Sequence, residues 1–414
     1  MPINYACDQL QAGMRLYEPV MSNCRALIAR GKQLTDHDIA TRRERFPALT
    51  VRIAESAIDN RVEFQDDHSA RKVAATVQQR TVEYLTTLMK SVRIGDPLTT
   101  EAFGDIERQA RLVMTYMKTE PSSTVLLAPC GDAASYLFAH TGNVLYLSLR
   151  LAHVALDYVI RERLRQTVAR ELEHGLVSDL APLATGALLM DLGMVPLSHS
   201  LESRSQLEAR DRQTLEDHPR VVADMLPPSA SAIVRMLVRT HHENMDGSGY
   251  PAGLSGEKLH VFTRVLRIAD AFDAATATRV YKSAKSPAKV LWEMTAGPYR
   301  RFYDDQLTKH LLALIQPFPI GTRVGLSDGR GAVVCKYNRR SPFRPVVAIC
   351  FDESGELLDE EAIEPAVNLA EDEQLRIASC GEEKLTFLDQ IPDPEVEPTK
   401  PAPVGDELYD AAFP

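Results

Sequence analysis

The chain has 414 residues, of which 44% are hydrophobic and 25% are charged, and its formal net charge is −10. This length allows roughly two to four domains, and the composition is ordinary for a soluble globular protein. The acidic balance argues against a surface that binds a nucleic acid polymer over the whole molecule, although it leaves room for a local basic pocket.

The N-terminus shows no basic segment followed by an apolar run, so we expect no signal peptide. The most apolar helical stretch, VLYLSLRLAHVALDYVI, contains Arg150, His153 and Asp157, which argues against a membrane span. The cysteines lack CxxC spacing, a pattern of reduced thiols and not of a disulfide framework or a zinc ribbon. We therefore expect a cytoplasmic protein without a membrane span. The six cysteines are Cys7, Cys24, Cys130, Cys335, Cys350 and Cys380.

The first 120 residues predict two different parts. Residues 1–65 mix short β-like runs (LYEPV, ALIAR, LTVRI) with one short helical stretch, DHDIATRRERF, which indicates a small α+β module. Residues 66–120 are charged, with apolar residues at near-helical spacing and a break at GDP. This pattern predicts two helices that connect domains or face a partner, and a homodimer through them is possible.

The rest of the chain divides into a helical, a β and a disordered segment. Residues 121–316 repeat apolar side chains every three or four positions, which predicts a helical bundle. Residues 317–385 alternate apolar and polar side chains around SDGRG, a hairpin turn, and so predict a small β-unit. Residues 386–414 are rich in proline and acidic residues and are predicted to be disordered. The fold class is therefore mainly α.

Six imidazole and carboxylate side chains interrupt the apolar helical faces of the bundle. Such groups, brought together inside a bundle, are the usual ligands of Mn, Fe or Zn in hydrolytic sites. Each one alone has a simpler explanation, because a single histidine is more often a core or surface group and a single aspartate often pairs with a base. His218 is expected at the start of a helix marked by Pro219. The six are His140, Asp191, His218, His241, His242 and Asp270.

The stretch HHENMDGSGYPAGL, residues 241–254, is a stronger signal. Two adjacent imidazoles at a helix end run into a turn with two glycines, a tyrosine and a proline, which has a defined backbone shape. Together with RVLRIADAFDA, this stretch resembles the HD-GYP domain, a helical branch of the HD-domain metal phosphohydrolases. The resemblance covers about residues 121–316 and implies an HD-domain-type helical bundle with two accessory parts.

HD-GYP proteins hydrolyse cyclic di-GMP, a bacterial second messenger, at a site with two or three metals, usually Fe or Mn. The resemblance therefore implies a phosphodiesterase of signal transduction with pGpG or GMP as product. It implies that His140, Asp191 and Asp270 hold a first metal, and that Asp191 bridges to a second. The second metal would be completed by His218, His241 and His242.

The resemblance also assigns basic residues and a signature loop. Arg279 and Lys282, in TRVYKSA, match the family's basic residues near the substrate phosphates, although a charge pair there otherwise indicates a solvated helix face. The signature loop is implied to contact partner proteins such as GGDEF-domain cyclases. It contains Asp246, Gly247, Gly249, Tyr250 and Pro251.

The chain departs from the family pattern at four positions. Met190 replaces the histidine of the name-giving pair, and its thioether is poorly matched to Mn(II) or Fe(II). Met194 replaces a lysine, which removes a cation beside the phosphate, and Val280 replaces a proline. Tyr136 replaces the glutamate of members with three metals, so a third metal is not expected.

Two hypotheses follow from these matches and departures. The first is a metal-dependent cyclic di-GMP phosphodiesterase, with one or two Mn or Fe ions, weakened by the loss of one ligand. The second is a catalytically inactive HD-GYP protein that acts as a receptor for the nucleotide or as a protein-interaction scaffold. Met190 and Met194 motivate the second hypothesis.

Overall fold

The structure, a computed structural model, describes residues 68–119, 133–166, 177–196, 209–277, 285–338, 340–381 and 383–390, and shorter stretches between residues 2 and 63. The described residues form two compact units. One is a helical unit within residues 68–282 and 293–315, and the other is a β-rich unit within residues 1–67, 283–292 and 316–398.

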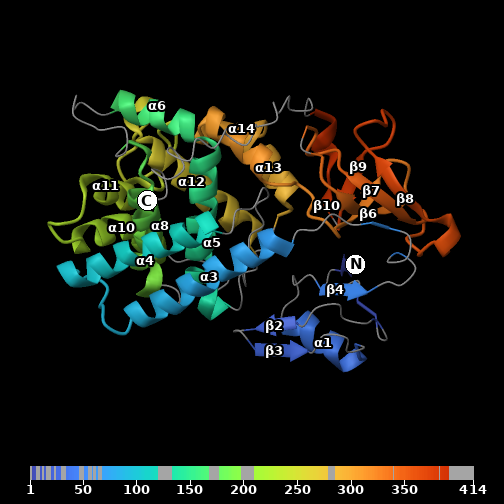
Figure 1. The fold of residues 1–414 in the computed structure, drawn as a ribbon, viewed down its shortest axis with the longest axis horizontal. Helices are drawn as coiled ribbons and strands as arrows, with labels where there is room; N and C mark the ends of the chain where they lie inside the picture. Colours follow the sequence, from blue (N-terminus) through green and yellow to red (C-terminus); the bar gives the residue numbers. More distant parts are fainter. Residues whose placement is uncertain are drawn as a thin grey trace. The chain divides into compact units, whose positions relative to one another are not determined.

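The helical unit is built around α5 (Ala133–Val154), which packs against α3, α8 and α12 (Figure 1). Every residue of α5 from 139 to 152 is buried, as expected for a helix with apolar residues on most of its faces. The other α-helices with residues in this unit are α3 (His68–Leu88), α4 (Thr100–Thr119), α6 (Leu156–Gln166), α8 (Ala181–Leu189), α10 (Ala209–Met225), α11 (Ala232–Thr240), α12 (Val261–Thr276), α13 (Pro287–Thr295) and α14 (Asp305–Leu314).

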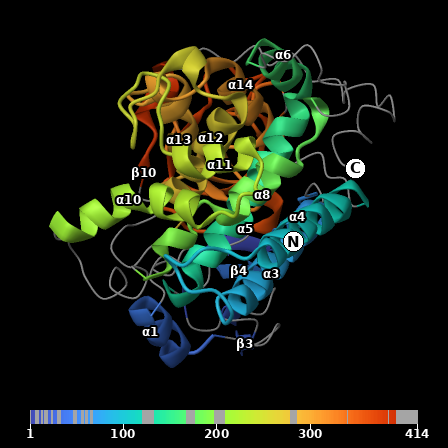
Figure 2. The ribbon, with the colours of Figure 1, turned by 90° about the vertical axis from the view of Figure 1, so that its left-hand side faces the viewer.

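Both helices predicted between residues 66 and 120 are present as α3 and α4. α3 packs along α5, and α4 packs against α8, so both are part of the helical unit (Figure 2). Val73, Val77 and Leu85 of α3 are buried, in agreement with the helical spacing of the apolar positions. Within the described part of the chain, no single helix is long and apolar enough to span a membrane; only α5 from Tyr136 together with α6, bent by 88°, meets that length and composition.

The C-terminal part of the β-rich unit is a six-stranded antiparallel sheet in the order β10-β9-β5-β6-β7-β8. The predicted hairpin at SDGRG joins β5 to β6, and there the Leu326 N–H donates to the Arg330 carbonyl at 2.8 Å. The predicted β-unit is thus present. Its strands are β5 (Arg323–Leu326), β6 (Gly331–Lys336), β7 (Val346–Phe351), β8 (Glu364–Asn368), β9 (Ile377–Cys380) and β10 (Glu383–Lys384).

The N-terminal part of the same unit contains two strand pairs and one helix, as predicted. β1 (Pro2–Tyr5) pairs with β4 (Val51–Ala54), β2 (Val20–Ser22) pairs with β3 (Arg25–Ile28), and α1 spans Asp36–Arg45. Thr35 and Asp38 cap α1 reciprocally through side chain and backbone.

One hydrophobic core joins the two parts of the β-rich unit. Ile58 and Val62 pack in the same cluster as Val333 and Ala348 of the sheet, and all four are buried. The described cysteines Cys335, Cys350 and Cys380 are free.

The prediction that disorder begins at residue 386 is wrong, because the first residues of this segment are ordered. Residues Thr386–Gln390 form the 3₁₀-helix η6, and the Phe387 ring stacks on Trp292 with 4.8 Å between ring centroids. Burial of this aromatic ring orders a segment whose composition alone predicts disorder. The remainder of the tail, residues 391–414, lies outside the described residues.

Candidate metal centre

The six predicted donors lie together in the helical unit as two groups that share Asp191. The four-donor position consists of Asp191, His218, His241 and His242, and the three-donor position consists of His140, Asp191 and Asp270. In each group the potential ligand atoms all lie within 4.8 Å of one another. Either group could therefore hold a metal ion through nitrogen and oxygen atoms.

The packing of α8 explains why these residues meet. Asp191 follows α8 and begins the 3₁₀-helix η2 (Leu192–Met194), and its carboxylate is not used to cap that helix. α8 packs against α5 and α11, and η2 packs against α10. The carboxylate after α8 is thereby brought to His140 of α5, His218 of α10 and His241 at the C-terminal end of α11.

His218 lies inside α10 and not at its start, so the prediction that Pro219 marks a helix beginning is wrong. A proline in a helix cannot donate to the carbonyl four residues earlier, which here belongs to Leu215. The His218 imidazole takes that place, since its Nδ1 lies 2.5 Å from the Leu215 oxygen. The helix continues because a side chain satisfies the carbonyl that the proline leaves open.

Two histidines of the four-donor position have defined tautomers. A carbonyl can only accept, so Nδ1 of His218 donates to Leu215 and Nδ1 of His241 donates to Val238 at 2.9 Å. In the neutral rings both Nε2 atoms then carry lone pairs, and these atoms lie 3.1 Å apart. Two facing lone pairs at this distance repel unless a cation lies between them. The donor geometry therefore fits a bound metal ion.

The charge states of His241, His242 and Asp191 also suit a metal. Burial and the neighbouring His218 lower the pKa of His241 to about 4, and burial together with His241 holds the pKa of His242 well below its usual value. Burial alone would raise the pKa of Asp191, but His218 and His140 outweigh it and lower that pKa to about 2. Neutral imidazoles beside an ionised carboxylate are the forms that coordinate divalent metals. Burial would lower the pKa of His140, but Asp270 and Asp273 outweigh it and raise that pKa to about 10, so a metal bound there would displace the Nε2 proton.

In the three-donor position, His140 points its Nε2 atom at two carboxylates. This atom lies 3.2 Å from Asp270 Oδ1 and 3.5 Å from Asp191 Oδ2. Its Nδ1 atom lies 2.6 Å from Asp273 Oδ2, and the Tyr136 ring stacks on the imidazole at 5.5 Å. The sequence reasoning missed Asp273, although a second aspartate three residues after Asp270 lies on the same helix face.

The two methionines that depart from the family pattern differ in their surroundings. Met190 is fully buried at the end of α8, where its N–H donates to the Gly186 carbonyl at 2.9 Å. Met194 ends η2 and is partly buried. Met190 thus packs as a core residue, which the flexible methionine side chain does readily.

The signature loop is held close to the histidine pair. Tyr250 donates its N–H to the His242 carbonyl at 3.3 Å, and its ring lies 4.8 Å from the His242 ring. A Cβ atom at Gly249 would lie 2.4 Å from the His242 oxygen and 2.5 Å from the Asn244 nitrogen. Glycine is required there because no side chain fits between the two backbone segments. Pro251 follows Tyr250 through a cis peptide bond.

A buried carboxylate that the sequence reasoning missed anchors the far end of this loop. Glu243 accepts the N–H groups of Ala252 at 2.7 Å and of Leu254 at 2.9 Å. At the loop start, Asp246 accepts from Ser248 and forms an ion pair with Arg301 at 3.0 Å, and Gly247 has a φ of +81°. All five residues of the predicted signature loop therefore lie in one hydrogen-bonded turn beside the donors.

Arg267 places a cation beside the three-donor position. Its guanidinium lies 3.5 Å from Asp270 Oδ2, donates to Asn244 at 2.9 Å, and lies over the Tyr303 ring. The sequence reasoning did not consider this residue. The predicted substrate-binding residues Arg279 and Lys282 lie outside the described residues.

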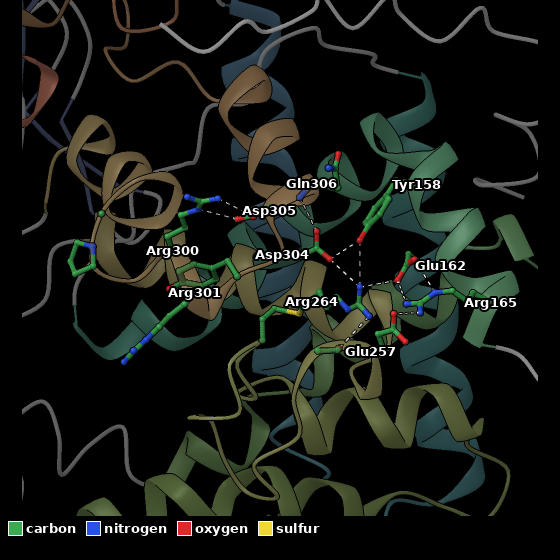
Figure 3. Close-up of a pocket in the computed structure, with 15 residues that line it drawn as sticks. Tyr158, Glu162, Arg165, Glu257, Arg264, Arg300, Arg301, Asp304, Asp305 and Gln306 are labelled. Atoms are coloured by element: carbon green, nitrogen blue, oxygen red, sulfur yellow. Dashed lines mark hydrogen bonds and ion pairs between the residues drawn. The ribbon is translucent and has the colours of Figure 1, made fainter. Parts of the chain in front are cut away.

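A separate cavity of about 930 Å³ in the helical unit is lined by paired charges (Figure 3). The buried Arg264 donates to Asp304 at 3.0 Å and to Glu162 at 2.9 Å, and the Tyr158 hydroxyl donates to Asp304 at 2.7 Å. None of the six described donors lines this cavity. The ion pairs join α12 to α6 and to the start of α14.

Comparison with known proteins supports this architecture. The family model described as an HD domain matches residues 160–307, and that of a KOW domain associated with HD domains matches residues 323–386. The cyclic di-GMP phosphodiesterase PA4108 from Pseudomonas aeruginosa is 26% identical over 281 residues, which are 67% of this chain and 62% of that protein. The 3'3'-cGAMP-specific phosphodiesterase 2 from Vibrio cholerae is 30% identical over 182 residues, 43% of this chain and 33% of that protein.

A solved structure, the HDG"Y"P protein Bd1817 from Bdellovibrio bacteriovorus, aligns over 75% of this chain and 98% of its own. It has 15% identity to this chain and a TM-score of 0.39. The family matches, the helical bundle and the C-terminal antiparallel sheet confirm the predicted fold class. Within the helical unit, residues 160–307 are similar to an HD domain, and residues 323–386 are similar to the KOW domain associated with HD domains.

Proposed function

We propose that this chain is a metal-dependent phosphodiesterase of the HD-GYP type that hydrolyses cyclic di-GMP in bacterial signalling. The observation that carries the proposal is the pair of buried donor groups joined through Asp191. Two adjoining metal positions are a recurring arrangement in enzymes that cleave phosphate esters. The named activity of the Pseudomonas relative supports the choice of substrate.

The donor set favours Mn or Fe, because imidazole and carboxylate together suit these ions. Bound there, such a metal stabilises negative charge on the phosphoryl oxygens. The residues that would hold it are the six donors, with Asp191 common to both positions. Arg279 and Lys282 are proposed to bind the substrate phosphates, in keeping with the preference of phosphate for such cations.

We propose further that the activity is weakened at the three-donor position. The histidine that family resemblance would supply is Met190, which is buried, and three donors remain. Loss of a supporting partner of a metal ligand typically costs ~10–100-fold in metal affinity or activity, and loss of a ligand should cost at least as much. The four-donor position keeps all the ligands that the family resemblance implies for it.

A second candidate function is a catalytically inactive receptor for cyclic di-GMP, or a protein-interaction scaffold. The burial of Met190 favours it, because a thioether packed in the core leaves the three-donor position short of a ligand. Contacts of the signature loop with GGDEF-domain proteins, a homodimer and a cytoplasmic location remain predictions under either function.

The direct test incubates the purified chain with Mn and cyclic di-GMP and separates pGpG and GMP by chromatography. We expect slow hydrolysis that EDTA stops, because the proposed site depends on metal. Asp191→Ala should abolish turnover, since this residue belongs to both positions. Asp96→Ala, in the exposed turn between α3 and α4, is the matched control and should leave the rate unchanged.

Nucleotide binding without turnover at any Mn concentration would select the receptor function. Faster cleavage of 3'3'-cGAMP than of cyclic di-GMP would instead move the substrate assignment toward that of the Vibrio relative.

A further inference from the structure

Asp273 lies buried between His140 and Asn143, on the side of the His140 ring that faces away from the metal donors. We propose that Asp273 is the positioning residue of the three-donor position, and that Asn143 and Gln78 extend its support to α3. The inference rests on the proposed function, because it concerns the metal position assigned there.

The first step is the orientation of the imidazole. Asp273 Oδ2 lies 2.6 Å from His140 Nδ1, and an ionised carboxylate can only accept, so Nδ1 donates. The other ring nitrogen, Nε2, is thereby aimed at Asp191 and Asp270, where a bound metal would take the place of its proton. A carboxylate that accepts from the far nitrogen of a ligating histidine fixes its tautomer and makes it a stronger ligand.

The second step is the fixing of Asp273 itself. Its other oxygen, Oδ1, accepts from the Asn143 amide at 2.8 Å, so both carboxylate oxygens have a partner. Asp273 and Asn143 are each 2% exposed, which excludes water as a ready substitute for either contact. A buried, fully bonded carboxylate holds one rotamer.

The third step reaches α3. The Gln78 amide donates to Asn143 Oδ1 at 3.3 Å, across the contact between α3 and α5. A Cβ atom at Gly142 would lie 2.9 Å from the Gln78 Cα atom, so this glycine permits the close approach of the two helices. A displacement of α3 would therefore be transmitted to His140 through the side chains of Asn143 and Asp273.

The three-donor position should be more sensitive to this support than the four-donor position. It has three donors, and His140 is its sole imidazole. In the four-donor position, His218 and His241 are oriented by backbone carbonyls and do not depend on Asp273. Removal of Asp273 is thus expected to act on one metal and spare the other.

The test titrates the metal-free full-length chain with Mn and counts free ions by electron paramagnetic resonance. The unchanged chain should bind two Mn. Asp273→Asn should lower the Mn affinity of the weaker class of site by ~10–100-fold. It should change the Mn affinity of the tighter class by no more than about twofold. Asn143→Ala, which keeps Asp273, should weaken the same class by a smaller factor, and Gln78→Ala by a few-fold at most. Thermal melting of each variant reports whether it folds.

Asp304→Asn is the matched control, because it removes another buried carboxylate of the helical unit that touches none of the donors. A purely structural role of Asp273 would make Asp273→Asn resemble this control, with a lower melting temperature and no selective loss of one class. Equal weakening of both classes, no change in either, or a single Mn in the unchanged chain would overturn the proposal. Two Mn classes without hydrolysis would contradict the proposed function alone and leave the positioning role standing.

Discussion

The two metal positions share a carboxylate but are built in different ways. In the four-donor position, the backbone orients His218 and His241 through carbonyls three residues earlier in the chain. In the three-donor position, side chains orient His140, with Asp273 and Asn143 behind it. In the first arrangement two of the three histidines are oriented by nearby carbonyls, whereas the second depends on particular distant residues. The difference predicts unequal tolerance to substitution.

The largest effect on this comparison is expected from the removal of one histidine from each metal position. His241→Ala should cost the four-donor position its metal, with a loss of ~100-fold or more in affinity, because a first ligand is removed. The three-donor metal should persist at reduced affinity. His140→Ala should show the reverse pattern. Metal content after dialysis against a fixed free Mn concentration measures both, and loss of both metals from either variant would break the distinction.

A smaller effect in the opposite direction is expected from Met190→His. The added imidazole would give the three-donor position a fourth ligand and raise its Mn affinity by roughly 10-fold. Without metal, the buried polar ring should lower the free energy of unfolding by about 1–3 kcal/mol. Thermal melting with and without Mn, together with the hydrolysis rate, measures both effects. An unchanged Mn affinity would mean that the side chain at residue 190 does not reach the site.

The smallest effect concerns the signature loop. Glu243→Gln keeps the volume but removes the charge that holds two N–H groups of the loop, so we expect a loss of about 1–3 kcal/mol in unfolding free energy. Because the loop packs on His242, Mn affinity should fall slightly at the four-donor position and not at the other. Denaturant melting and the Mn titration check this. A larger loss at the three-donor position would contradict the assignment of the loop to one side.

The sequence allowed much of this arrangement to be predicted, for physical reasons that differ between residues. Imidazoles and carboxylates on apolar helix faces stand out, because burial of such groups is costly unless they are used. The helix around His218 was misjudged, since a proline normally ends or begins a helix and the Leu215 carbonyl contact cannot be read from the chain.

Asp273, Asn143 and Glu243 were missed for a related reason. Each acts through a partner on a distant segment or a neighbouring loop, and no local pattern marks such a partner. The packing of α3 on α5 is likewise a tertiary contact, and the apolar spacing of α3 does not reveal which helix it packs against. The ordered Phe387 shows the same limit, because composition cannot reveal the Trp292 ring on which it stacks.

The most direct test is the Mn titration of the unsubstituted, metal-free chain. Two adjoining positions with four and three donors should bind two Mn ions per chain, the second ~10–100-fold more weakly than the first. Two ions of equal affinity would contradict the inequality of the two positions, and the absence of Mn binding would contradict the metal centre itself.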